Sequence, residues 1–184
     1  LHRGRLVAAV SVSVEEGAGQ VQTVALGREV LSRLQEMYYG VTDTPVGEQL
    51  KKAIIRTAEE FPGLQIAAAV FWGQRIHLAT GGGAGVWVTT GKGKQGWLVK
   101  PERPSQEFQI QYFEGKAEQG KVLVLGTHGF WTLVSERLLV AAVTRLETNF
   151  QDAVEMIVSE VQAVDGEGGG AGTIIRIQNV DETG

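Results

Sequence analysis

The residue types that commonly carry out enzymatic chemistry form no recognisable catalytic motif in this 184-residue chain. Its three histidines, His2, His77 and His128, lie far apart in the sequence, and none belongs to a His-Glu-x-x-His metal-binding pattern. The chain has no cysteine, which excludes a thiol nucleophile, a disulfide and a thiolate metal site. It also lacks the Gly-x-Ser-x-Gly elbow of serine hydrolases.

His128 is the histidine with the most informative surroundings. It follows the apolar run Val122-Leu123-Val124-Leu125, which is typical of a buried strand, and it lies in the turn-like sequence Gly126-Thr127-His128-Gly129. The aromatic pair Phe130-Trp131 comes next, and the residues after it open like a helix. A lone imidazole binds a transition metal only with further ligands, and none is visible beside it. We therefore interpret His128 as a structural or core histidine.

The composition indicates one globular domain over residues 1–184, because 43% of the residues are apolar. Its 21 acidic and 17 basic side chains give a net charge of −4, which argues against nucleic-acid binding. No apolar run is long enough to insert into a membrane, and the N-terminal residues do not form a signal peptide. The absence of cysteine fits a reducing compartment, so we expect a cytoplasmic protein.

Periodicity and turn residues predict an α+β chain in which hairpins alternate with pairs of helices. The predicted helices span residues 20–39, 47–61, 135–144 and 150–164. The predicted strands span residues 5–14, 64–71, 75–80, 86–90, 97–99, 107–114, 122–125 and 173–177. The glycine run at residues 81–85 is interpreted as a tight connection between two strands, since it lacks the Gly-Lys-Ser/Thr ending of a phosphate-binding loop.

The strand, turn, aromatic pair and helix around His128 resemble a signature of the PP2C-type metal-dependent serine/threonine phosphatases. That family places Ser/Thr-Asp-Gly-Phe/Leu-Trp-Asp after the strand. In this chain His128 takes the place of the metal-binding Asp, and Thr132 takes the place of the second Asp.

Other landmarks of the family occur in the expected order, also without their acidic residues. The resemblance places Ser11 at the metal-bridging Asp of the first strand and Gly83 at the Asp of the Gly-Asp-Ser-Arg motif. Gly170 and Ala171 replace the Asp-Asn pair before the last strand. The segment from Asp165 to Gly169 matches the letters of the first metal motif, but it lies near the wrong end of the chain and is interpreted as a flexible loop.

The resemblance implies a β-sandwich of two antiparallel sheets flanked by helix pairs, with an N-terminal strand of the family missing. Because every acidic landmark is replaced, we expect no metal, no other cofactor and no enzymatic activity. The predicted function is that of a pseudophosphatase, a regulatory or scaffolding domain that binds protein partners.

Three alternatives remain open at this stage. The chain could be a divergent metal-dependent phosphoprotein phosphatase that uses His128 and unrecognised carboxylates. It could be a structural subunit of a larger complex, in which neighbours cover its exposed apolar residues. A weaker alternative is a small-anion sensor at the glycine run of residues 81–85.

Overall fold

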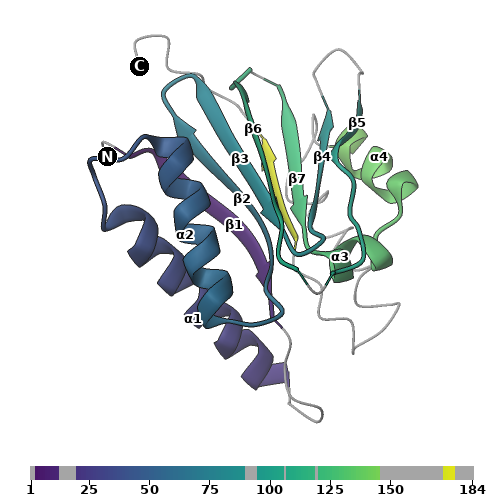
Figure 1. Ribbon diagram of the computed structural model, residues 1–184. Helices are drawn as coiled ribbons and strands as arrows, with labels where there is room; N and C mark the ends of the chain where they lie inside the picture. The colour runs from purple at the N-terminus through teal and green to yellow at the C-terminus, as the bar shows by residue number, and fades with distance from the viewer. Residues whose placement is uncertain are drawn as a thin grey trace.

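Two antiparallel four-stranded sheets form the centre of the computed structural model, with helices on both outer faces (Figure 1). The structure describes residues 3–12, 20–89, 95–105, 107–118, 120–145 and 172–176. In chain order, the elements are β1 (Arg5–Ser11), α1 (Gln20–Tyr39), α2 (Val46–Glu60), β2 (Gln65–Trp72), β3 (Arg75–Gly81), β4 (Gly85–Thr89), β5 (Gln95–Val99), β6 (Ile110–Lys116), β7 (Val122–Gly126), α3 (His128–Leu133), α4 (Glu136–Arg145) and β8 (Gly172–Arg176).

The first sheet has the strand order β1-β2-β3-β6, and the second has the order β5-β4-β7-β8. The chain passes between the sheets at the turn that joins β3 to β4. Helices α1 and α2 lie on the outer face of the first sheet, whereas α3 and α4 lie beside the second (Figure 1). This four-layer arrangement confirms the predicted fold class.

Alternating side chains of the strands divide the core into three layers, because successive residues of a strand point to opposite faces. On β2, Ile66, Ala68 and Val70 pack with α1 and α2, while Ala67 and Ala69 face the second sheet. Strand β7 divides in the same way: Leu123 and Leu125 join the layer between the sheets, and Val122 and Val124 join the layer that includes Phe130 and Leu139.

The predicted strands and helices correspond closely to those observed, with differences of a few residues at their ends. One prediction was wrong: Gly126-Thr127-His128-Gly129 is not a free turn, because β7 extends to Gly126 and the short helix α3 begins at His128. The predicted helix over residues 150–164 and the loop over residues 165–169 lie outside the described residues. Within the described chain, no helix is long and apolar enough to cross a membrane.

Candidate functional site

Three of the residues singled out from the sequence lie at one end of the sandwich, where β1 ends, β3 turns into β4 and α3 begins. Ser11 is the last residue of β1 and pairs with Gln65, the first residue of β2. Gly81, at the end of β3, pairs with Ile66, so the turn containing Gly83 follows at the same end. His128 begins α3 directly after β7.

Gln65 connects these three positions. Its side-chain Oε1 accepts a hydrogen bond of 2.8 Å from the backbone N–H of His128, which links the two sheets. A side chain at Gly82 would collide with the backbone of Leu64 and Gln65, so the β3–β4 turn lies directly against this residue. The sequence analysis did not single out Gln65. The only available signal was a polar residue at the start of the otherwise apolar strand Gln65–Trp72.

The aromatic pair after His128 fixes α3 against the second sheet. The indole N–H of Trp131 donates to the carbonyl oxygens of Gly85 and Gly126, at 3.0 Å in both cases. Phe130 is buried and lies against Gly126 and Gly172, where any larger residue would collide with its ring. These contacts set the position of the His128 backbone, since α3 is only six residues long.

His128 itself is half-buried, and its ring Nδ1 is buried without a hydrogen-bond partner in the part of the chain that the structure describes. Among the residues that the structure describes, no carboxylate or second histidine forms a group with it that could hold a metal ion. The interpretation of His128 as a structural histidine remains a prediction.

The glycine run is a tight connection between strands, as expected. Gly82 and Gly83 have φ angles of 70° and 91°, a region of backbone conformation that favours glycine. The segment of residues 101–104 lies across this turn, and the backbone N–H of Glu102 donates to the carbonyl oxygen of Gly83 at 3.1 Å. A side chain at Gly83 would collide with the carbonyl of Glu102. The turn and the segment therefore fit together only because residue 83 has no side chain.

A pocket of about 210 Å³ opens beside this turn, and its wall consists mainly of polar side chains. Its charged members are two cations, Lys100 and Arg103, and two carboxylates, Glu102 and Glu107. The remaining wall comes from Thr80, Gly81, Gly82, Gly83, Ala84, Ser105, Gln109 and Gln111. Balanced charge of this kind does not favour a small anion, so the geometry gives no support to the anion-sensor alternative.

The residues that the resemblance assigns to the family's metal-binding positions do not fit a pair of divalent cations. Magnesium and manganese sites are built from several carboxylate and carbonyl oxygens. Ser11 offers one hydroxyl, Gly83 offers no side chain and His128 offers one imidazole. Among the described residues, no group of three or more His, Cys, Asp or Glu side chains could hold a metal ion.

Gly170 and Ala171 lie outside the described residues. Gly172, which follows them in the sequence, begins β8 and pairs with Gly126 at the end of β7.

Comparison with solved structures identifies the fold. The chain superimposes on PppA, a key regulatory component of T6SS in Pseudomonas aeruginosa, with a TM-score of 0.67 and 9% sequence identity over 93% of this chain and 86% of that one. The serine/threonine phosphatase PstP/Ppp of Mycobacterium tuberculosis gives a TM-score of 0.62 and 13% identity over 95% and 99% of the two chains. A catalytic domain of PstP in complex with two manganese ions gives 0.56 and 13% over 93% and 98%.

No family model matches the sequence, and no curated protein is similar to it. At such low identities, the structural likeness defines the fold and nothing finer. The fold is that of the PP2C-type (PPM) serine/threonine phosphatases.

The prediction that this chain is not an enzyme is contradicted by the same comparison. The proteins that share its fold include serine/threonine phosphatases, one of them with two bound manganese ions, so this fold carries enzymatic activity in other proteins. The prediction depended on aspartates missing from positions matched by sequence. Metal ligands, however, are brought together by tertiary structure, and Asp152, Asp165 and Asp181 lie outside the described residues.

Proposed function

We propose that this chain is a regulatory or scaffolding domain built on the PP2C phosphatase fold, and that it acts by binding a protein partner. One observation carries the proposal: the framework at the end of the sandwich where α3 begins spans both sheets, while the resemblance assigns Ser11, Gly83 and His128 to the family's metal-binding positions. Gln65 and Trp131 hold this framework together across the two sheets. Binding a protein requires a stable shape and polar groups at the surface, and both are present at this end.

The fold comparison supports a regulatory role in one respect. PppA, which is a key regulatory component of T6SS in its own organism, has a TM-score of 0.67 with this chain. We carry over from PppA only the general idea of a regulatory role, and we do not propose that this chain acts in T6SS. It further takes residues 1–184 as one domain that works in the cytoplasm, in keeping with the lack of cysteine.

A divergent metal-dependent phosphoprotein phosphatase is the second candidate function. The comparisons favour it, because this chain shares its fold with serine/threonine phosphatases. It requires carboxylates that reach the site end from residues outside the described ranges. His128 is the described side chain at that end that such a site would most readily recruit, since its Nδ1 lacks a partner there.

Two measurements on the purified chain separate the candidates. The first is calorimetric titration with Mn²⁺ and Mg²⁺, run beside phosphate release from an aryl phosphate and from phosphopeptides. The second is affinity capture with the tagged chain, followed by measurement of the stoichiometry and affinity of the purified partner.

Saturable binding of one partner at a fixed stoichiometry is the result expected for a regulatory domain. If capture yields no such partner, and metal-dependent turnover is found that His128→Ala abolishes, the second candidate replaces the first. His2→Ala is the matched control for the turnover assay, because His2 has no place in the resemblance.

A further inference from the structure

The opposite end of the first sheet carries a row of three side chains on neighbouring strands. Trp72 at the end of β2 pairs with Arg75 at the start of β3, and Arg75 pairs with Lys116 at the end of β6. Residues directly opposite each other in antiparallel strands place their side chains on the same face of the sheet. We call Trp72, Arg75 and Lys116 the basic row.

The basic row borders a hollow of about 470 Å³ at the β2–β3 turn. Its wall is formed by Trp72, Gly73, Gln74, Arg75 and Lys116. The turn is fixed in place: Gly73 has a φ angle of 59°, and the backbone N–H of Ala117 donates to the carbonyl oxygen of Gln74 at 2.7 Å. The hollow is therefore a defined feature of the surface.

Trp72 is 48% exposed, more than any other large apolar side chain in the described part of the molecule. Large aromatic side chains are normally buried, and at protein interfaces they often supply much of the binding energy. Gly4 packs against Trp72 Cβ and the Phe71 carbonyl, which supports the tryptophan from behind and leaves its ring outward.

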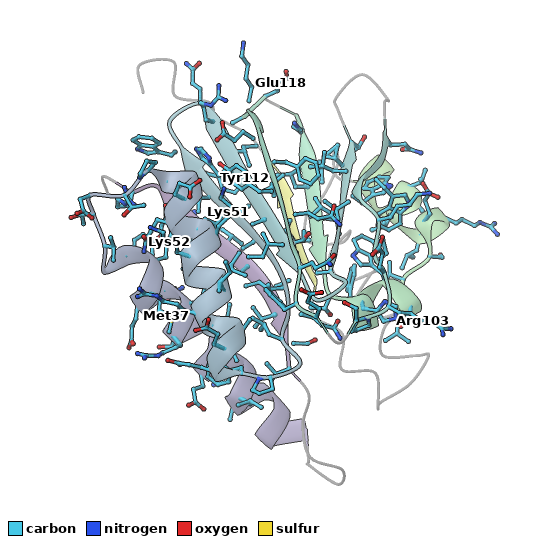
Figure 2. The ribbon with its side chains drawn as sticks, in the orientation of Figure 1. Met37, Lys51, Lys52, Arg103, Tyr112 and Glu118 are labelled. Carbon is cyan, nitrogen blue, oxygen red and sulfur yellow. The ribbon has the colours of Figure 1, made fainter. Side chains whose placement is uncertain are left out.

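The two charged side chains in the wall of the hollow, Arg75 and Lys116, are both cations, although the chain as a whole carries a net charge of −4. Arg75 forms an ion pair of 3.1 Å with Glu114, whereas none joins Lys116 to a carboxylate of the described residues. Glu118 lies just beyond the end of β6 (Figure 2) and adds a second carboxylate, after Glu114, at this end of the sheet.

We propose that the basic row is a docking site for an acidic peptide segment of a partner protein, with an apolar side chain of that segment lying on Trp72. This inference deepens the partner-binding function proposed above and rests on it. Carboxylates of the segment would lie beside Lys116 and Arg75, and charge complementarity of this kind guides both encounter and orientation. The site is at the end of the sandwich opposite His128 (Figure 1).

The test measures the fluorescence anisotropy of a labelled peptide of Glu-Leu-Glu repeats added to the full chain. A peptide of Gln-Leu-Gln repeats serves as the neutral control, and a labelled oligothymidine tests for nucleic acid. We expect Trp72→Ala and Lys116→Glu each to weaken binding of the acidic peptide by about tenfold or more. The same peptide should shift the NMR signal of the Trp72 indole N–H and leave that of buried Trp87 in place.

Two variants provide matched controls. Arg5→Glu reverses another exposed cation at the same end, but Arg5 pairs with Phe71 and not with the basic row. Leu98→Ala removes an apolar side chain that is 38% exposed elsewhere. Each should change the affinity by less than about twofold. Thermal unfolding of every variant verifies its fold, and the exposure of Trp72 makes the substitutions there tolerable.

The inference is overturned if the acidic peptide does not bind, if the neutral peptide or oligothymidine binds as tightly, or if Arg5→Glu weakens binding as much as Lys116→Glu. Its failure differs from that of the proposed function. A captured partner that still binds the Trp72→Ala and Lys116→Glu variants with unchanged affinity would remove only the docking site. The absence of any partner for the unmodified chain would remove the proposed function.

Discussion

His77 is a buried titratable residue at the centre of a short polar chain on β3 and β6. Its Nδ1 lies 2.6 Å from the hydroxyl of Tyr112, and that hydroxyl donates to Glu114 Oε1 at 2.7 Å. Because the hydroxyl has only one proton to donate, we assign the ring proton of His77 to Nδ1. Nε2 then remains a buried acceptor without a partner in the described residues.

Burial lowers the pKa of His77, and the cation of Arg75 adds to this effect, whereas the carboxylate of Glu114 opposes it. From α2, Lys51 lies 4.9 Å from the centre of the Tyr112 ring, and Glu48 pairs with Lys51 (Figure 2). The groups that face His77 are therefore Tyr112, Arg75 and Glu114 from the sheet, with the Lys51–Glu48 pair behind them. The folded protein keeps this histidine neutral more strongly than the unfolded chain does.

The free energy of unfolding should therefore fall as the pH decreases below about 6.5, the pKa of an unperturbed histidine. In that range the unfolded chain binds a proton that the folded chain resists, and the loss levels off below the lowered pKa of the folded state. Urea unfolding at a series of pH values measures this slope, and His77→Gln should flatten it. A slope that persists unchanged in His77→Gln would refute the assignment.

A separate decrease is expected at lower pH. The hydroxyl of Tyr112 and the guanidinium of Arg75 hold the pKa of Glu114 below its usual value. Stability from that carboxylate is present above its unfolded pKa of about 4.3 and is lost as the pH falls through the lower folded value. The contributions of His77 and Glu114 to the free energy of unfolding are therefore lost in different pH ranges, and the same series of urea unfolding experiments separates them.

At the scale of elements, the β3–β4 turn and the segment of residues 101–104 depend on one another. The segment crosses the turn at Gly83, and Pro101 lies against Gly85. Backbone hydrogen bonding between Glu102 and Gly83 completes the contact. This element pair forms one wall of the pocket at the site end, so its packing sets the shape of that end.

Gly83→Ala should reduce the free energy of unfolding by about 1–3 kcal/mol, because it places a Cβ against the Glu102 carbonyl at a φ angle of 91°. Urea unfolding measures the change. Gly115→Ala on β6 is the matched control: its Cβ would meet nothing within 4 Å, and its φ is not positive. Equal stability of the two variants would show that the segment does not rest on the turn.

At the scale of the whole molecule, the small side chains of β2 set how closely the layers approach. Ala67, Ala68 and Ala69 are fully buried, with Ala68 toward the helices and the other two toward the second sheet. Protein cores are packed too densely to accept a larger side chain without movement. The spacing between the sheets therefore depends on these alanines.

Ala69→Leu should destabilise the protein by about 1–3 kcal/mol, because the added atoms must separate the sheets or displace Leu78 on the neighbouring strand. Thermal unfolding followed by circular dichroism measures the loss. Ala141→Leu on the exposed face of α4 adds the same atoms in solvent and should change the stability by less than about 0.5 kcal/mol. If Ala69→Leu is as stable as this control, the alanines do not limit how closely the two sheets approach each other.

Local sequence patterns predicted most elements because those patterns act over a few residues. The helix over residues 20–39 was predicted with the bounds that α1 has, since its apolar residues recur at helical spacing. Helix α3 was missed, because it begins within the turn-like, glycine-containing stretch of residues 126–129. It forms through contacts of Phe130 and Trp131 with strands β4 and β7, and these contacts are not visible in the local pattern.

The sequence by itself determined the order and type of the elements, the alternation that separates the core layers, and the lack of a recognisable catalytic motif. Only the tertiary structure decided which distant residues meet. Gln65 and His128 are 63 positions apart, and Trp72, Arg75 and Lys116 lie in one row only through the register of three strands. The physical reason is that helix and strand preferences arise from neighbouring residues, whereas both ends of this molecule are assembled by sheet register and by the stacking of one sheet on the other.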